Sequence, residues 1–505
     1  MQIINPINPK HSRPLDVHLW SDHPEINGLV KDIFNSFSDE EKRTIEGRSN
    51  NKGRASGRTH LKVVLLDLYV AWKDDPELSI GVARGNGAYN VGSRYNALFI
   101  SPKIRPVIDL LIKLGLIDSV AGSHNRQGNR FGNHTSRIRA SEKLGYLFQG
   151  LTLEPFDLSL NHNEECIILR KQDVKESGSG TENRQVSEDY KDTDKTVAMR
   201  RDLTKYNELL SRTYIDIPSL EEPFIERKLS NGQIQRVPIN QTRKFVRRIF
   251  SRNSWELNGR FYGGFWQQIG KEFRKQIVIN SSPTIEVDYK GLHVSLLSAK
   301  KGIVDIEDHY ELGALILPEA FALEQRDIVK SLLLTAINAK SPKSAFAAFR
   351  NSQPQGSIAK TLTNGQLSKL LQAFISKHPH LEEDICSDKG IELMYLDSQI
   401  TSYIINKFTE LNKPILSVHD SYIVGSRDTE LLRDAMKAAT IKLVGCDLSV
   451  DQTGISYSQI HSWRHLDRDY YLDTFQSVFI DYERTTQYQD RYNRFKLSMQ
   501  TSSDG

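Results

Sequence analysis

The sequence predicts an α+β protein with several domains, and three observations support this prediction. Apolar residues recur at helical spacing in several segments, for example at Leu61, Val64, Leu65 and Leu68. Residues 284–289 and 414–425 instead show the patterns of β-strands, the second as a hairpin, which predicts an antiparallel sheet. The length of 505 residues suggests more than one domain, at about 150 residues each.

The composition is that of a soluble protein, with 38% apolar and 26% charged residues. We expect no membrane partner, because no apolar run approaches the roughly 18 residues of a membrane span. The N-terminal residues lack a basic segment followed by an apolar one, which argues against secretion. The three cysteines are widely spaced, which excludes a disulfide framework or a cysteine-rich zinc site. We therefore expect a cytoplasmic protein, associated with the nucleoid if the source is bacterial.

Positive charge is concentrated in two segments, although the net charge of the chain is only +4. Residues 241–275 contain nine basic and two acidic residues, and residues 119–143 contain five basic and one acidic. Such segments favour nucleic acid, because each neutralised phosphate releases counterions. A solvated helix face is the alternative for either segment alone, but both contain aromatic and amide side chains among the basic ones, which favours nucleic acid.

Changes in composition divide the chain into six parts. Residues 1–50 are predicted to be a helical or irregular lead-in, and residues 51–150 a compact domain. Residues 171–195 hold few large apolar side chains, which predicts a flexible linker. We predict a helical, basic region over residues 196–280, an α/β region over residues 281–465 and a helical tail over residues 466–505.

The domain at 51–150 shows a recognisable order of predicted helices and strands. A helix over 58–73 is followed by a second helix that begins at Ser101-Pro102 and ends at Gly115. Strands at 116–117 and 135–139 flank a polar, glycine-rich segment. This order resembles a winged helix-turn-helix, which implies a helix in the major groove and a basic wing along the DNA backbone. The residues it indicates are Lys103 and Arg105 on the helix, and Arg126, Arg130, Arg137 and Arg139 in the wing. Protein contact is the alternative role.

Two aspartates occupy polar positions in the predicted strands. Asp288 lies at the end of a strand, on the face opposite Ile285 and Val287. Asp420 lies in the sequence His419-Asp420-Ser421, at or near the tip of the hairpin at 414–425. Caps and turns are the ordinary role of aspartate at such places. Placing His419 and Asp420 between apolar strands would cost burial energy unless both have partners.

A predicted helix over 324–338 presents two basic residues on one face. Arg326 and Lys330 are one turn apart, and apolar residues occupy the opposite side. Alone, this pattern is typical of a solvated helix face.

In their order along the chain, these segments resemble the motifs of the family A DNA polymerases. Asp288-Tyr289 resembles motif A, Arg326 with Lys330 resembles motif B, and Val418-His419-Asp420-Ser421 resembles motif C. Ser421 is more similar to the single-subunit phage-type RNA polymerases. Asn258-Gly259-Arg260, followed by Gln267, is similar to a stretch that precedes motif A. The resemblance covers residues 255–430 and implies a right-hand polymerase-like region, with an antiparallel palm sheet and helical fingers.

The resemblance implies a role for each matching residue. Asp288 and Asp420 would bind two Mg²⁺ ions, with Mn²⁺ as a substitute, and His419 would act near the primer terminus. Arg326 and Lys330 would contact the triphosphate, and Asn338 and His293 stand at nucleotide-binding positions. Arg260 and Gln267 would contact nucleic acid, and Arg243 and Arg247 would do so from a thumb-like basic helix over 243–252. Two aspartates from neighbouring strands suit nucleotidyl transfer, because metal ions about 4 Å apart need hard oxygen ligands held close together.

The sequence also departs from the family pattern. Asn338-Ala339 stand where motif B usually has Tyr-Gly, and His293 stands near the usual glutamate sugar gate. We predict a template-directed DNA polymerase that uses a DNA template, a primer and nucleoside triphosphates, in a phage or mobile element. A non-enzymatic DNA-binding initiator or repressor is one alternative, and a single-subunit RNA polymerase or primase is another.

Overall fold

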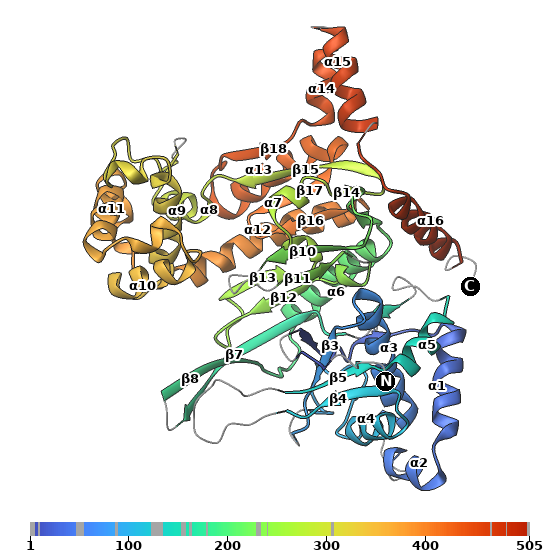
Figure 1. Ribbon diagram of the computed structural model, residues 1–505. Helices are drawn as coiled ribbons and strands as arrows, with labels where there is room; N and C mark the ends of the chain where they lie inside the picture. The colour runs from blue at the N-terminus through green and yellow to red at the C-terminus, as the bar shows by residue number, and fades with distance from the viewer. Residues whose placement is uncertain are drawn as a thin grey trace.

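Figure 1 shows the fold of the chain, from a computed structural model. The structure describes residues 6–8, 11–46, 55–85, 89–122, 135–152, 158–160, 164–177, 180–228, 234–239, 241–304, 308–464, 467–480 and 482–501.

The N-terminal unit is built on a four-stranded sheet in the order β1-β3-β5-β4. The strands are β1 (Ser12–Pro14), β3 (Ser79–Val82), β5 (Ser136–Ala140) and β4 (Ile117–Val120). The helices are α1 (Pro24–Ser36), α2 (Asp39–Glu46), α3 (Gly57–Asp74), α4 (Ile104–Lys113) and α5 (Glu142–Gln149), and β2 (Leu19–Trp20) pairs with β6 (Ser159–Leu160). One apolar core runs from Leu19 to Leu158. The described part of residues 1–50 therefore belongs to this unit and is not a separate lead-in.

Helix α4 and the antiparallel pair β4–β5 form where the winged-helix pattern expects a helix and two strands. The tip between these strands, including Arg126 and Arg130, lies outside the described residues.

A long hairpin replaces the expected flexible linker at 171–195. Strand β7 (Ile167–Ser177) pairs with β8 (Gly180–Ser187) from Arg170–Ser187 to Ser177–Gly180. The base of β7 is buried and pairs with β12 (Arg247–Phe250) in a sheet of order β13-β12-β7-β8. Because backbone hydrogen bonds hold a hairpin together, it forms with few large apolar side chains.

The region at 196–280, expected to be helical and thumb-like, begins with one long helix but then consists mainly of short strands and loops. After α6 (Asp194–Ser211) come β9 (Ile215–Asp216), β10 (Phe224–Lys228), β11 (Ile234–Pro238), β12, β13 (Asn258–Tyr262), the short α7 (Lys271–Arg274) and β14 (Val278–Ile279). The basic helix expected over 243–252 is a 3₁₀ turn at Gln241–Lys244 followed by β12. Burial of Val246, Ile249 and Phe250 and pairing with β13 favour the strand.

The central sheet is antiparallel, as predicted for this region. Its order is β16-β17-β15-β14-β9, formed by β16 (Ile415–Val418), β17 (Ser421–Gly425) and β15 (Ser282–Tyr289), and β18 (Val450–Thr453) also pairs with β15. Helices α12 (Gly390–Glu410) and α13 (Thr429–Val444) pack against one face. There the Thr401 and Tyr422 hydroxyls lie 2.9 Å apart, and the Tyr289 hydroxyl donates to the Met436 carbonyl at 2.8 Å. The other face is left for the side chains of Glu286 and Asp288.

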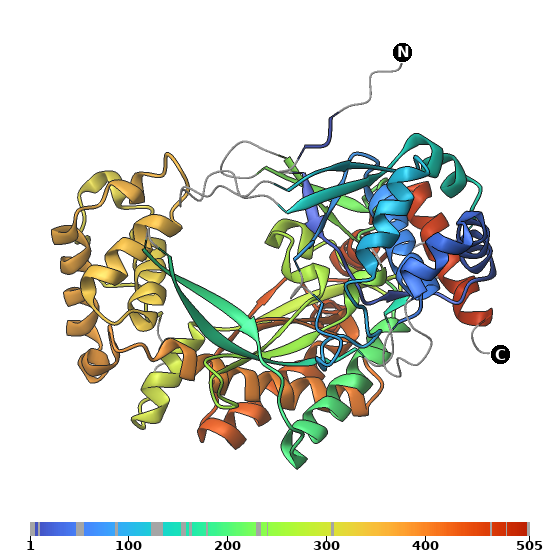
Figure 2. The same cartoon turned by 90° about the horizontal axis from the view of Figure 1, so that it is seen from below.

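A helical lobe lies to one side of the central sheet, away from the N-terminal unit (Figure 2). It contains α9 (Gln325–Asn338), α10 (Pro342–Ser352) and α11 (Asn364–Lys377), and α8 (Leu292–Lys300) leads from the sheet towards it. Helix α14 (Tyr457–Trp463) precedes the tail, and the tail forms α15 (Arg468–Phe475) and α16 (Thr486–Thr501). Among the helices of the described part of the chain, none is long and apolar enough to cross a bilayer.

Candidate active site

The two predicted aspartates lie next to each other on the central sheet. Asp288 is paired with Ser421 in the register of β15 and β17, and the Tyr289 amide donates to the Asp420 carbonyl at 3.2 Å. Val418 pairs with Ser421, so His419 and Asp420 form a two-residue turn. Residues 132 positions apart (420 − 288) thus meet at one end of two strands.

His419 adopts a left-handed backbone conformation in this turn, with φ 55°. Non-glycine residues rarely adopt this region, and such strain clusters at functional sites. The His419 ring lies 5.8 Å from the Tyr262 ring. Partial desolvation of the ring and the nearby Arg260 lower the pKa of His419, which favours a neutral imidazole, although the residue as a whole is exposed. A neutral imidazole beside Asp420 can accept or donate a hydrogen bond.

A third carboxylate joins the pair, and the sequence analysis missed it. Asp451 on β18 is directly opposite Asp288 in the register of β15 and β18. Opposite residues in antiparallel strands project to the same face, so the two side chains are neighbours. A single charged residue in a four-residue strand carries no sequence signal for this. Only the pairing of β18 with β15 brings Asp451 to the site.

The carboxylates repel one another. Burial raises the pKa of Asp288 to about 6, with further contributions from the charges of Asp420 and Asp451 that Lys271 only partly offsets. Within the described part of the chain, neither Asp288 nor Asp420 forms a side-chain ion pair. Such a site is stabilised by a cation from solution.

Ser421 takes part in a buried network on the same face. Its hydroxyl donates to Glu286 at 2.7 Å, and Arg274 holds the same carboxylate with two hydrogen bonds of 3.0 and 3.1 Å. The charge of Glu286 is therefore neutralised inside the protein, unlike that of Asp288. Ser421 supports the turn through this network.

Arg326 and Lys330 on helix α9 lie near Tyr310, and Tyr310 in turn lies within electrostatic reach of Asp420. Both cations lie 5.9 Å from the Tyr310 ring, and Asp420 contributes to raising the pKa of the Tyr310 hydroxyl, which burial dominates. Tyr310 packs on Gly291, where a Cβ atom would lie 3.1 Å from the tyrosine oxygen. Arg326 is paired with Asp308 at 2.6 Å, whereas Lys330 has no ion pair among the described residues. Lys330 is thus the better placed of the two for an anionic ligand.

Two predicted nucleotide-binding residues have different surroundings. Asn338 is exposed at the end of α9, donates to the Leu334 carbonyl at 2.7 Å, and leaves no room for a side chain at Gly390. His293 is buried on α8, with its Nε2 atom 3.0 Å from an Arg260 nitrogen. Burial and Arg260 lower the pKa of His293 to about 4.

Arg260 is held beside the site by a buried acid that the sequence analysis missed. Its Nε atom donates to Asp397 Oδ2 at 2.7 Å. Asp397 lies on the buried face of α12 with Leu393, Ile400 and Ile404. A charged residue at helical spacing among apolar ones is the signal that could have identified it, because burying a charge is costly.

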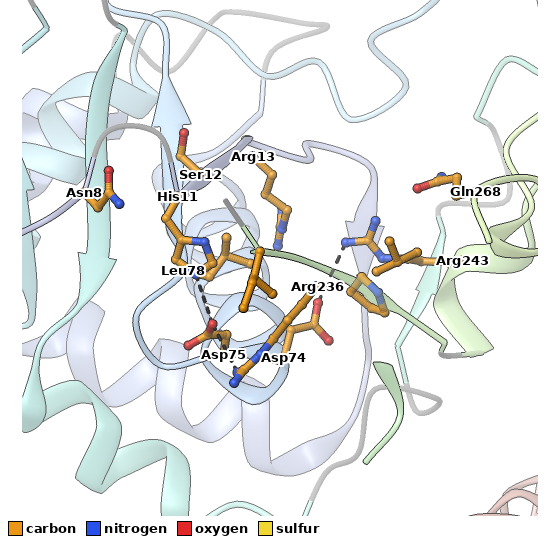
Figure 3. A pocket seen from close by; sticks show the side chains of 13 residues that line it. Asn8, His11, Ser12, Arg13, Asp74, Asp75, Leu78, Arg236, Arg243 and Gln268 are labelled. Carbon is orange, nitrogen blue, oxygen red and sulfur yellow. Dashed lines mark hydrogen bonds and ion pairs between the residues drawn. The ribbon is translucent and has the colours of Figure 1, made fainter. Parts of the chain in front are cut away.

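The other predicted nucleic-acid contacts of this region bond within the protein. Gln267 donates to the Phe261 and Ser417 carbonyls at 3.0 and 2.9 Å and accepts from the Gly263 amide. Arg247 is paired with the buried Glu164. Arg243 lines a pocket at the junction with the N-terminal unit, 3.8 Å from Asp74, next to the Arg236–Asp75 pair of 3.2 Å (Figure 3). Arg243 and Arg247 thus contact other parts of the chain, and no basic helix carries them.

The basic residues of the N-terminal unit are also bonded internally. Lys103 donates to the Thr44 carbonyl at 2.7 Å, Arg105 to the Arg84 carbonyl at 2.8 Å, and Arg137 to the Ser12 hydroxyl at 2.8 Å. These bonds occupy donors of the three cations but leave their positive charge intact, because carbonyl and hydroxyl oxygens are neutral acceptors.

The oxygen donors of the central sheet fit a divalent cation. Among the described residues, no group of three His, Cys, Asp or Glu side chains forms a complete metal site. Mg²⁺ commonly takes only one or two carboxylates and completes its shell with water and substrate phosphates. Asp288 and Asp420, both half-buried and without an ion pair among the described residues, match this incomplete donor set.

Comparisons with known proteins give little support to any family. No protein-family model and no curated protein matches the chain. Among solved structures, the chain is similar to the POL domain of Pol1 from M. smegmatis, described as a complex with DNA primer-template and dNTP. The identity is 11%, the match covers 52% of this chain and 53% of that chain, and the TM-score is 0.19. The chain spans about half of that structure, and a likeness of this size carries no argument.

Proposed function

We propose that this protein is a template-directed nucleotidyltransferase, and that it extends the 3′-hydroxyl of a DNA primer. The observation that carries the proposal is the adjacency of Asp288 and Asp420 at one end of the paired strands β15 and β17, without cationic partners among the described residues. Lys330 and Arg326 on α9, reaching the same place across Tyr310, supply the positive charge that a triphosphate needs.

Each group has a role in this reaction. Asp288 and Asp420 would hold Mg²⁺, which lowers the pKa of the attacking hydroxyl and offsets charge on the leaving pyrophosphate. Lys330 and Arg326 bind the triphosphate and stabilise the charge that develops on it. His419, neutral and fixed in its turn, orients the primer terminus beside Asp420. Arg260 contacts the nucleic acid at the same end of the sheet.

The N-terminal unit would bind duplex DNA near the catalytic region. Its helix α4 and β4–β5 pair support a winged-helix arrangement. Lys103 and Arg105 would have to exchange their internal acceptors for DNA phosphates, so we expect a modest contribution from each.

A primer-extension assay tests the proposal. The full chain is incubated with a primed DNA template and Mg²⁺ or Mn²⁺, and dNTPs and rNTPs are offered separately. We expect dNTP-dependent extension that EDTA abolishes and that Asp288→Asn and Asp420→Asn eliminate. Extension with rNTPs alone would favour the RNA polymerase or primase alternative. Duplex binding without extension under any condition would favour a non-enzymatic DNA-binding protein.

A further inference from the structure

Three elements converge on the Arg260 guanidinium beside the candidate active site. Arg260 comes from β13, Asp397 from α12 and His293 from α8. The Arg260 Nε atom lies 2.7 Å from Asp397 Oδ2, and a terminal nitrogen lies 3.0 Å from His293 Nε2. Asp397 is 1% exposed and Arg260 15% exposed, so the acid is sealed in the core while the guanidinium reaches its edge.

This network lies within electrostatic reach of the catalytic turn. Burial raises the pKa of Asp397 to about 7, against the effect of Arg260, and the charge of Asp420 raises it further. Arg260 also contributes to lowering the pKa values of His293 and His419. His293 is therefore neutral, and since its Nε2 accepts from Arg260, its proton is on Nδ1. Arg260 thus faces one neutral acceptor and one buried acid.

The Asp397–Arg260 pair is not needed to dock β13 on α12, because neighbouring contacts already do this. Arg248 donates to the Gly259 carbonyl at 2.9 Å and to the Ser398 hydroxyl at 3.1 Å. Gly259, with φ 74°, approaches α12 so closely that a Cβ atom would lie 2.8 Å from the Ser398 hydroxyl. A buried ion pair is moreover a poor source of stability, because desolvation opposes the attraction. The desolvation cost of the Asp397–Arg260 pair indicates a role other than stabilising the fold.

We propose that Asp397 is a positioning residue that orients Arg260 to receive the terminal nucleotide of the nucleic-acid substrate. Asp397 fixes Nε and His293 fixes one terminal nitrogen, so the guanidinium plane has one orientation. The other terminal nitrogen has no partner among the described residues and presents two N–H donors. These donors bind acceptor atoms of the nucleotide beside His419 and Asp420. The inference rests on the proposed function and adds to it a residue outside the family-like motifs.

The chain offers a matched control pair. Arg491 on α16 donates to Asp216 on β9 at 2.9 Å, with side-chain exposures of 16% and 2%. The residue types, the hydrogen-bond distance and the side-chain exposures of this pair resemble those of Arg260–Asp397. Asp216, however, lies at the opposite edge of the central sheet from the β16–β17 hairpin. A loss of buried charge alone should affect both pairs equally.

The experiment measures steady-state extension and thermal unfolding for Asp397→Asn, Arg260→Ala, the double variant and Asp216→Asn. We expect Asp397→Asn to lower kcat/KM for primer-template about tenfold, with little change in the KM for nucleotide. The double variant should be no worse than Arg260→Ala, because Asp397 acts through Arg260. Asp216→Asn should lower the unfolding temperature at least as much but leave kcat/KM within about twofold. Should Asp397→Asn fail to fold, Arg260→Lys tests the same geometry, because lysine keeps the charge but loses the fork.

The inference is overturned if Asp397→Asn and Asp216→Asn have equal effects on rate, or if the effects of Asp397→Asn and Arg260→Ala add. Failure of the proposed function looks different: Asp288→Asn and Asp420→Asn would then retain wild-type extension, or the wild-type protein would show none.

Discussion

The central sheet and the N-terminal unit differ in whether their charged side chains have bonding partners within the protein. At the end of β15, Asp288 and Asp420 lie together with no cationic partner among the described residues, and Asp451 increases their repulsion. In the N-terminal unit, Lys103, Arg105 and Arg137 each donate to an oxygen of the same unit. The two aspartates have no cation to give up when a metal ion binds, whereas these basic residues keep their charge but must exchange a hydrogen bond to a neutral oxygen for one to a ligand. The contrast therefore favours the central sheet as the place of the proposed chemistry and predicts a weaker role for the N-terminal cations.

The largest effect should follow removal of either unneutralised aspartate. Asp288→Asn or Asp420→Asn should lower kcat for primer extension on the order of 10³-fold, because charge stabilisation in the transition state is lost. Binding of primed DNA, measured by fluorescence anisotropy, should stay within about twofold. Wild-type rates in both variants would show that the acidic end of the sheet is not the catalytic site.

Lys330→Ala should have the next largest effect. The KM for nucleotide should rise about tenfold, because a charge-assisted contact to the triphosphate is lost from ground and transition states alike. Arg326→Ala should have a smaller effect, since Asp308 already neutralises part of its charge. Single-turnover titration with nucleotide separates binding from chemistry. An unchanged KM in the Lys330 variant would remove α9 from the site.

Asp451→Asn tests whether the third carboxylate takes part in cation binding. It should raise the Mg²⁺ concentration needed for half-maximal extension a few-fold, because one negative charge beside Asp288 is lost. Asp447, paired with Lys437 at 3.0 Å, offers a nearby control in the variant Asp447→Asn. If the two variants respond equally to Mg²⁺, Asp451 has no special place at the site.

The stability of the protein should depend on pH through Asp288. Its folded pKa of about 6 lies above the unfolded value of 3.8, so the native state binds this proton more tightly. This stabilising contribution is complete below about pH 4 and is lost as the pH rises through 6. Without divalent ions, the wild-type unfolding temperature should fall over this range relative to Asp288→Asn, and Mg²⁺ should restore it. Parallel profiles for the two proteins would contradict the repulsion.

The smallest effect belongs to the N-terminal unit. Lys103→Ala should weaken duplex binding less than about tenfold and reduce the slope of log affinity against log salt by about 1. Glu41, which pairs with Lys113 at 2.6 Å, supplies a charge-changing control in Glu41→Gln. An unchanged salt slope would indicate that the unit binds protein.

Short-range patterns were enough to predict the elements that carry the candidate site. The strand that ends at Asp288–Tyr289, the helix that ends at Asn338 and the hairpin around His419 lie within a residue or two of their predicted positions. Each depends on a local period, a glycine or a turn, which the sequence carries. The predicted basic helix over 243–252 was wrong. Burial of Ile249 and Phe250 and the pairing of β12 with β7 and β13 favour a strand there.

The sequence by itself thus determined which side chains could perform nucleotidyl transfer, since strand alternation and helix spacing decide which face each one occupies. Only the tertiary structure decided which of them are available. The register of β15 and β18 places Asp451 opposite Asp288, and packing buries Asp397 against Arg260. Acceptors within the protein bind the side chains of Gln267, Arg247 and Lys103. The physical reason is that neutralisation and burial depend on partners far along the chain, which no local pattern encodes.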